Sequence, residues 1–317
     1  MCPVLINLVP EFLDILASSN REAAYQQYLE RHRAVLEAYW SNYVLDLNDH
    51  HADGVIGAAL RADRSDLRSM LQRTKISELA ETAIARAGDL LQLDQPTDVY
   101  LMVGVGGANA GELVVNGRGV AFVCVEHFTG KVNPTSYGLG LAPDLIPLWV
   151  GHELAHTVRY TSPTSRSELK SLVEEAGGNY SYWATAGRAT LRELLVNEGL
   201  AVHAAQQLAP GHDIADYFGY PKRQFQRLRE MDAFLRRAAH HDLDRFGIGL
   251  RLRFLSGGLS PGSRLALNRV LPERSGYYLG YRMVEALVAD QGLASAVRAS
   301  AHEFETAEEA RPDVRTA

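Results

Sequence analysis

The hydrophobic and polar positions of the chain divide it into parts of different pattern. From about residue 20 to 93, apolar residues recur at three- and four-residue spacing, which predicts a run of amphipathic helices. Residues 98–103, 112–115 and 120–125 are short runs rich in β-branched residues, and these predict strands. Helical patterns return in 166–302. The pattern therefore predicts an α+β fold that is mostly helical and holds a small, mainly antiparallel sheet.

Turn and linker residues divide the chain further. Asn116-Gly117, between two of the expected strands, is a strong signal for a two-residue β-hairpin. The polar stretch TSPTSRSE around residues 161–168 is typical of a linker. We expect an N-terminal helical region at 1–95, a small sheet with a buried helix at 96–165, a helical subdomain at 166–302 and a flexible tail at 303–317.

The stretch 145–158, LIPLWVGHELAHTV, is apolar on nearly every side of a helical projection. Such a pattern predicts a helix that is buried all round, with the small sheet packed on it. Asp144 is the expected N-cap. Pro147 would fall in the first turn, where its missing N–H has little consequence.

The strongly polar residues of this apolar helix are His152, Glu153 and His156, the pattern His-Glu-x-x-His. Positions four apart lie on one helical face, so both imidazoles can reach one zinc ion. Glu153 lies about a hundred degrees around the helix, where it could take a proton from an attacking water molecule. The pattern predicts a zinc hydrolase with one catalytic Zn²⁺. The alternative is two core histidines bonded to backbone carbonyls, with Glu153 paired to an arginine.

A catalytic zinc ion needs a third protein ligand besides two histidines. Glu198 lies in a helical pattern at 190–207, in which Gly199 and several alanines would permit close packing on a second helix. Glu175 is nearer in sequence, but Gly177-Gly178 follow it and suggest a helix end. Both glutamates are candidates on this reasoning.

The segment Asn197-Glu198-Gly199-Leu200-Ala201 resembles the one that carries the zinc glutamate in gluzincins such as aminopeptidase N. The resemblance favours Glu198, so the implied metal ligands are His152, His156 and Glu198. The spacing departs from that of aminopeptidases, whose glutamate would fall about where Glu175 lies. An insertion between residues 160 and 190 is therefore required.

The chain is also similar to the small bacterial predicted zinc-dependent proteases. These combine a His-Glu-x-x-His helix, a Glu-Gly-Leu-Ala helix and a late Gly-Tyr segment, which here is residues 270–284, VLPERSGYYLGYRMV. The resemblance covers residues 98–300. It implies a zincin-like metallopeptidase that acts on a peptide or protein substrate, with Glu153 as general base.

The oxyanion that forms during peptide hydrolysis needs a hydrogen-bond donor besides the metal. Candidates are Tyr277, Tyr278 and Tyr281, because Gly276 and Gly280 would let their backbone approach the site. Tyr277 and Tyr281 share a helical face, and we assign the role to this pair with a preference for Tyr277. The alternative is that a tyrosine-rich helix start packs in the core.

In a gluzincin-like enzyme, the strand edge just before the motif helix would hold an extended peptide by strand addition, which predicts broad selectivity. The glycine cluster VGVGGANAG at 103–111 does not fit a dinucleotide fingerprint. Its third glycine would fall on Asn109, and a hairpin rather than a helix follows. We therefore expect no nucleotide cofactor.

Composition excludes several other classes of protein. The 317 residues are 46% hydrophobic, with a net charge of −6 and no basic run, which argues against nucleic acid as a partner. The N-terminal apolar stretch has no basic flank and is interrupted by Glu11 and Asp14, so we expect no membrane partner and a cytoplasmic protein. Cys2 and Cys124 are too few for a cysteine-rich zinc site.

Two alternative functions remain at this stage. One is a non-peptidase zinc amidase related to deformylases, in which Cys124 would have to serve as the third ligand. The other is a catalytically inactive zinc-containing protein that binds peptides. Retention of Glu153, which a purely structural zinc site does not need, argues against the second alternative.

Overall fold

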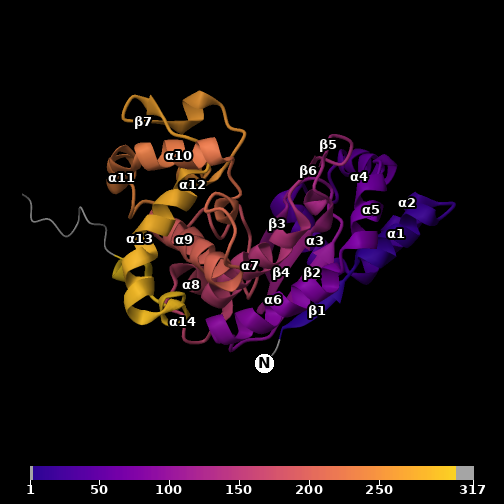
Figure 1. The fold of residues 1–317 in the computed structure, drawn as a ribbon, viewed down its shortest axis with the longest axis horizontal. Helices are drawn as coiled ribbons and strands as arrows, with labels where there is room; N and C mark the ends of the chain where they lie inside the picture. Colours follow the sequence, from indigo (N-terminus) through magenta and orange to yellow (C-terminus); the bar gives the residue numbers. More distant parts are fainter. Residues whose placement is uncertain (1–2, 305–317) are drawn as a thin grey trace, which may run out of the picture.

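The computed structural model describes residues 3–304. Figure 1 shows two bodies of structure that flank one helix, α7 (Ile146–Thr161). The sheet and the N-terminal helices lie on one side of α7, and the C-terminal helices lie on the other side. The expected tail at 303–317 lies outside the described residues from 305 onward.

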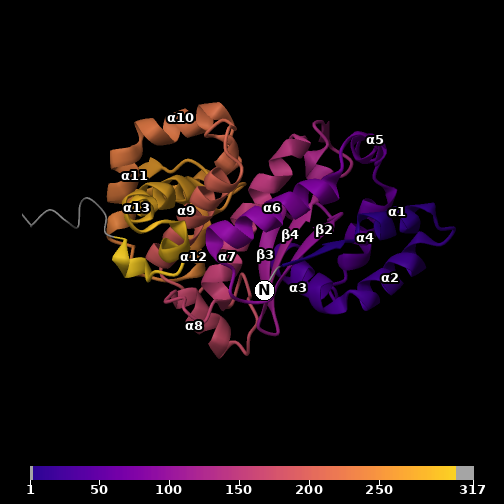
Figure 2. The same ribbon diagram turned by 60° about the horizontal axis from the view of Figure 1, so that its bottom comes forward.

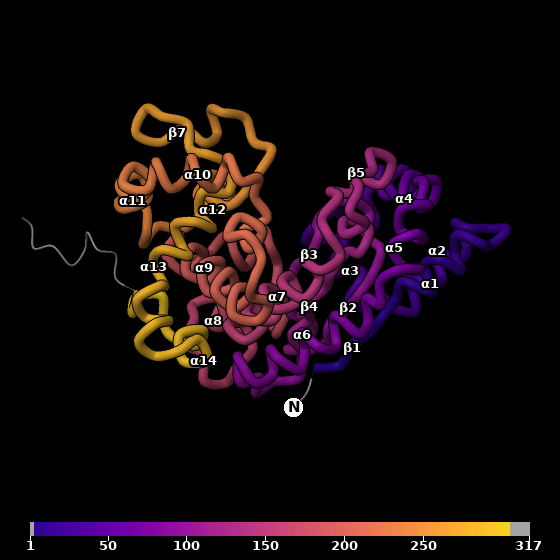
Figure 3. Tube along the Cα trace, in the orientation of Figure 1, coloured from indigo at the N-terminus to yellow at the C-terminus, as the bar shows by residue number. Residues whose placement is uncertain are grey.

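The tube in Figure 3 follows the chain through these bodies. The N-terminal elements are β1 (Val4–Asn7), α1 (Val9–Ala17), α2 (Arg21–Arg31), α3 (Arg33–Tyr43), α4 (Ala52–Arg61), α5 (Ser65–Arg73) and α6 (Ile76–Leu91). The central strands are β2 (Thr97–Met102), β3 (Ala110–Val115), β4 (Arg118–Cys124), β5 (Val132–Asn133) and β6 (Gly138–Leu139). After α7 come α8 (Glu168–Glu175), α9 (Leu191–Leu208), α10 (Lys222–Glu230), α11 (Asp232–His240), α12 (Ile248–Leu255), β7 (Leu265–Ala266), β8 (Arg269–Val270), α13 (Ser275–Gln291) and α14 (Leu293–Ala296). The fold is therefore α+β and mostly helical, as the sequence predicts.

The central sheet has the strand order β1-β2-β4-β3. The hairpin β3–β4 is antiparallel and turns at Asn116 and Gly117, both at positive φ, as the sequence predicts. The pairs β1–β2 and β2–β4 are parallel. The sheet is thus mixed, and the expectation of a mainly antiparallel sheet is wrong. The reason is that a long helical crossover joins β1 to β2, and that β2 pairs with β4 instead of with β3, its neighbour in the chain.

Helix α7 is the centre of the molecule. It contacts β3 and β4 on the sheet side, and α6 and α9 on other sides. Every residue from Leu148 to Tyr160 is buried, which confirms the prediction of a helix buried all round. The helix begins one residue later than expected. Asp144 lies in a single 3-10 turn, and Leu145 occupies the N-cap position without a side-chain cap.

Helices α9 and α13 cross at two glycines, Gly199 and Gly280. A Cβ built on Gly280 would overlap the Leu195 carbonyl oxygen, and a Cβ built on Gly199 would overlap the Gly280 carbonyl group. The helices therefore approach with their backbones in direct contact, as the small residues near Glu198 predict. This contact sets the distance between the α9 side chains and the start of α13.

One hydrophobic core extends across the sheet and the helices packed around α7. Among residues 3–304, no helix combines the length and the hydropathy that a membrane span requires.

Candidate functional site

Two helices bring the predicted metal ligands together. His152 and His156 lie one turn apart on α7, and Glu198 reaches them from α9. The Nε2 atoms of His152 and His156 lie 3.5 Å and 3.6 Å from the same Glu198 oxygen, Oε2. Zinc held tetrahedrally by bonds of 2.0–2.2 Å separates its ligand atoms by about 3.3 Å. The three donors are thus spaced within a few tenths of an ångström of a zinc site.

Unsatisfied polar atoms support the same fit. Glu198 Oε2 is buried and has no hydrogen-bond partner among the described residues. His152 and His156 are each only 2% exposed, and Glu198 is 9% exposed. A buried carboxylate oxygen without a donor is costly unless a cation or a donor faces it. The donor set of two imidazoles and one carboxylate is one that zinc favours, so the residues fit this ion.

The charges of these groups depend on one another. Burial alone would raise the pKa of Glu198, but the facing nitrogens of His152 and His156 outweigh it and hold that pKa well below its usual range. Burial lowers the pKa of His152. Burial also opposes charge on His156, yet Glu112 and Glu198 more than offset it and raise the pKa of His156 to about 10. The site therefore attracts positive charge, which favours a bound cation.

Glu153 lies next to this group on the side of His156. Its carboxylate, a carboxylate oxygen of Glu112 and a ring nitrogen of His156 all lie within 4.8 Å of one another. Burial raises the pKa of Glu153 well above its ordinary value, and the negative charges of Glu112 and Glu198 add to the effect. A carboxyl group with a raised pKa beside a metal site is suited to accept and return a proton.

Glu112 on β3 is a site residue that the sequence reasoning did not identify. Its carboxylate accepts hydrogen bonds from the hydroxyls of Tyr43 and Tyr160, each at 3.0 Å. Tyr160 in turn accepts a hydrogen bond from Asn197 Nδ2 at 3.0 Å. Glu112 is the one acidic residue in the strand sequence AGELVV, and this is the signal that could have identified it. Its side chain joins β3 and α3 to the helix that carries Glu153.

The two predicted tyrosines lie in different places although both are on α13. The Tyr277 ring lies parallel to the His152 ring, with centroids 6.3 Å apart. The Tyr281 ring stacks on His203 at 4.3 Å, and its hydroxyl donates to Gln206 Oε1 at 3.4 Å. The structure therefore brings Tyr277, and not Tyr281, to the candidate metal ligands.

The competing ligand candidates lie elsewhere. Glu175 is exposed at the end of α8 and forms an ion pair with Arg188 at 2.6 Å. Cys124 is fully buried beside Gly104 and Tyr39, and it belongs to none of the ligand groups found within residues 3–304. The structure therefore groups neither side chain with His152 and His156.

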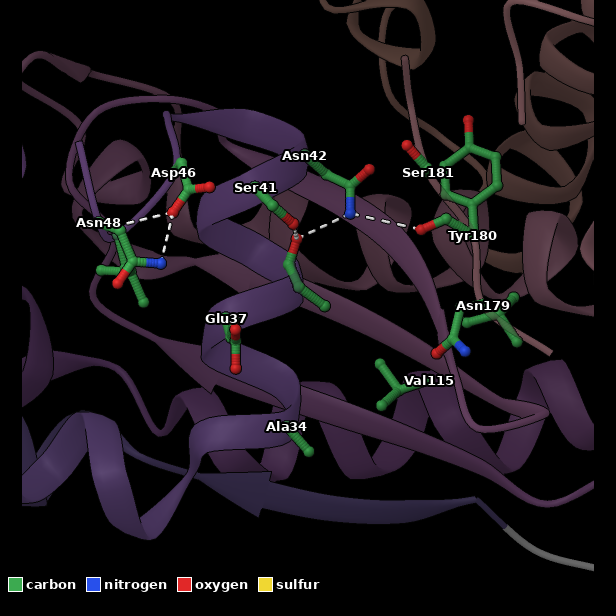
Figure 4. A pocket seen from close by; sticks show the side chains of 13 residues that line it. Ala34, Glu37, Ser41, Asn42, Asp46, Asn48, Val115, Asn179, Tyr180 and Ser181 are labelled. Carbon is green, nitrogen blue, oxygen red and sulfur yellow. Dashed lines mark hydrogen bonds between the residues drawn. The ribbon is translucent and has the colours of Figure 1, made fainter. Parts of the chain in front are cut away.

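The outer edge of β3 is not free to pair with a peptide at its centre. The Tyr43 hydroxyl lies 2.9 Å from Glu112 O and accepts a hydrogen bond from Glu112 N at 3.1 Å. Tyr180 N donates to Val114 O at 3.0 Å. A pocket of about 320 Å³ lies beside this edge, and Figure 4 shows Asn42 of α3 reaching across it to the Tyr180 carbonyl. Strand addition at Glu112 and Val114, which the sequence led us to expect, would require these contacts to open.

Comparison with known proteins identifies a similar protein family. Residues 180–306 match a family model described as predicted Zn-dependent protease (DUF2268). The matched segment contains Glu198 and Tyr277, and it leaves out the helix with His152 and His156. No curated protein and no solved structure matches the chain. The match supports the family resemblance that the sequence motifs indicate, over less than half of the chain.

Proposed function

We propose that this protein is a zinc-dependent metallopeptidase that hydrolyses peptide bonds. The observation that carries the proposal is the convergence of two imidazole nitrogens on Glu198 Oε2 at the spacing of a zinc site. Glu153 follows the first histidine on the same buried helix. The family model that matches the C-terminal part of the chain, described as a predicted Zn-dependent protease, supports the same activity.

Each residue has a distinct role in this proposal. His152, His156 and Glu198 would hold one zinc ion, which supplies Lewis acidity at the scissile carbonyl. Glu153 accepts a proton from the attacking water at a carboxylate oxygen. It returns that proton to the leaving amine nitrogen as the C–N bond breaks. Tyr277 donates a hydrogen bond to the oxyanion from its hydroxyl.

The test combines metal analysis with an unbiased peptide library. Native protein and Glu153→Gln should both contain about one zinc ion, because Glu153 is not a ligand. The native protein should cut library peptides, and Glu153→Gln should be slower by about 10²–10⁴-fold because it lacks the general base. Equal cleavage by the two proteins would remove Glu153 from the mechanism. Bound zinc without cleavage by either would favour a peptide-binding protein.

A matched pair of glutamate variants tests the ligand assignment. Glu198→Ala should lose zinc, since it removes one of three protein donors. Glu175→Ala is the control, because Glu175 is exposed on α8 and contacts Arg188 instead of the histidines. Zinc retained by Glu198→Ala and lost by Glu175→Ala would reverse the assignment.

A further inference from the structure

Arg274 is an arginine with an unusual position at the start of α13. It is the N-cap residue of that helix and has a left-handed backbone, with φ of 54° and ψ of 27°. Its guanidinium carbon lies 4.4 Å from the centre of the Tyr277 ring and 5.5 Å from that of Tyr220. The Tyr220 hydroxyl donates to the Arg274 carbonyl oxygen. The rings of Tyr277 and Tyr220 therefore both face the guanidinium group, and the hydrogen bond from Tyr220 holds the Arg274 backbone.

The guanidinium group lies next to the candidate zinc site. Tyr277, on which it stacks, also lies parallel to His152. A Cβ built on Gly219 would lie 3.5 Å from Arg274 Nη1 and 3.1 Å from the Trp149 ring, and Trp149 in turn contacts the His152 ring at 5.2 Å. Tyr277 thus links Arg274 to His152 through ring contacts, and Gly219 leaves space between Arg274 and the Trp149 ring.

Arg274, like the buried Arg64 and Arg251, forms no ion pair with a carboxylate within residues 3–304, whereas other buried arginines do. Arg159 forms an ion pair with Glu193, and Arg192 forms one with Asp244. The adjacent Glu273 pairs with Arg264, at 3.4 Å, and Arg274 is only partly buried. Planar guanidinium groups bind carboxylates through paired N–H···O bonds, and partial exclusion of water strengthens such pairs.

From these positions we infer that Arg274 binds a carboxylate group of the substrate beside the scissile bond. The inference rests on the proposed peptidase function and names its substrate class: peptides that carry a carboxylate near the cleavage position. That carboxylate is either the free C-terminus or the side chain of an aspartate or glutamate. Stacking on Tyr277 places the positive charge beside the residue that would donate to the oxyanion.

A purely electrostatic role is the competing explanation. Burial opposes the charge on Arg274, but Tyr277, Tyr220 and Glu198 outweigh it and raise the pKa of its guanidinium group. The charge of Arg274 also opposes the upward shift in the pKa of Glu153. If Arg274 only balanced these carboxylates, its removal would affect charged and neutral peptides equally. A substrate-binding role affects them unequally, so the two explanations can be separated.

The experiment measures peptide capture without turnover. Zinc-loaded Glu153→Gln protein is mixed with two libraries of identical N-acetylated hexapeptides, one with free C-terminal carboxylates and one with carboxamides. At each internal position, half of the peptides in each library have glutamate and the other half have glutamine. Captured peptides are quantified by mass spectrometry. The same measurement is made on double variants that combine Glu153→Gln with Arg274→Met, Arg274→Lys or Arg269→Met. Circular dichroism verifies that each variant is folded.

We expect the carboxylate-bearing peptides to be captured about 10- to 100-fold better than their neutral counterparts. Arg274→Met should abolish this preference and leave capture of neutral peptides within about threefold. Arg274→Lys should retain part of it, because lysine keeps the charge without the planar fork. Arg269→Met is the matched control, since Arg269 also stacks on a ring, Phe234, but lies on the exposed β7–β8 hairpin.

The pattern of preference identifies the source of the carboxylate. Preference between the two libraries indicates the C-terminus, and preference for internal glutamate indicates a side chain. Equal capture of charged and neutral peptides, a preference that survives Arg274→Met, or capture of no peptide would each overturn the inference. An Arg274-dependent preference in a protein whose native form cuts nothing would instead support the inference and reject the peptidase function.

Discussion

Because α9 and α13 contact each other through their backbones, we predict that Gly280→Ala destabilises the protein. The added methyl group would overlap the Leu195 carbonyl oxygen and lie 3.0 Å from Gly199 N. Both neighbours are backbone atoms, which cannot rotate away as a side chain can. The two helices would have to separate by roughly 1–1.5 Å, and close-packed interiors do not absorb such a shift. Overpacking of this kind destabilises by about 3 kcal/mol, the upper part of the usual range.

The gain in helix propensity from glycine to alanine, about 1 kcal/mol, offsets only part of this loss. For a chain of 317 residues, a net destabilisation of about 2 kcal/mol should lower Tm by about 3 °C. Thermal denaturation followed by circular dichroism measures the shift. The separation also moves Tyr277 away from Glu198, so the rate of peptide cleavage should fall, because Tyr277 is the proposed donor to the oxyanion.

Gly88→Ala is the matched control in α6. A Cβ on Gly88 would meet no atom within 4 Å, so alanine there should stabilise the protein by about 0.5–1 kcal/mol. Opposite shifts for two helical glycines would show that the backbone contact, and not helix propensity, decides the outcome. A Gly280→Ala protein that melts at or above the native temperature would refute the reasoning.

Two further predictions follow from buried charges. The pKa of His156 is raised to about 10 in the metal-free protein, so this ring carries a proton between pH 6 and 8. Zinc must displace that proton, and the zinc Kd should therefore rise about tenfold for each pH unit lowered in this range; a Kd that is flat with pH would contradict this. Glu193→Gln should destabilise the protein by about 3–5 kcal/mol in urea denaturation, because it leaves the fully buried Arg159 without its counter-charge. A loss below about 1 kcal/mol would show that the carbonyl oxygens of Val297 and Ala299, each 3.1 Å away, suffice for Arg159.

The features that could be predicted from sequence are those encoded within one element. The apolar stretch around His152 indicated a helix with no solvent-facing side, and it is buried throughout. Asn116-Gly117 indicated a hairpin because both residues tolerate positive φ. Both signals reside in neighbouring residues, so no knowledge of the rest of the fold was needed.

The remaining features depend on how distant elements pack. Glu112 joins the site because β3 lies against α7, and strand periodicity carries no information about that contact. Tyr277 and Tyr281 are equivalent in a helical projection, yet only the first turn of α13 lies beside His152. The parallel pairing of β1 with β2 could not be predicted either. Leu5 of β1 and its partner Val99 of β2 are 94 positions apart in the sequence (99 − 5), and the helices α1 to α6 lie between them.

The hydroxyl of Tyr43 also covers part of the outer edge of β3. An uncovered strand at the rim of a sheet is a template on which a second molecule can assemble. Here the Tyr43 hydroxyl contacts the backbone N–H and carbonyl oxygen of Glu112, and the backbone N–H of Tyr180 donates a hydrogen bond to the Val114 carbonyl oxygen. They take the place of a neighbouring strand, and so protect the protein from self-association through this rim at high concentration.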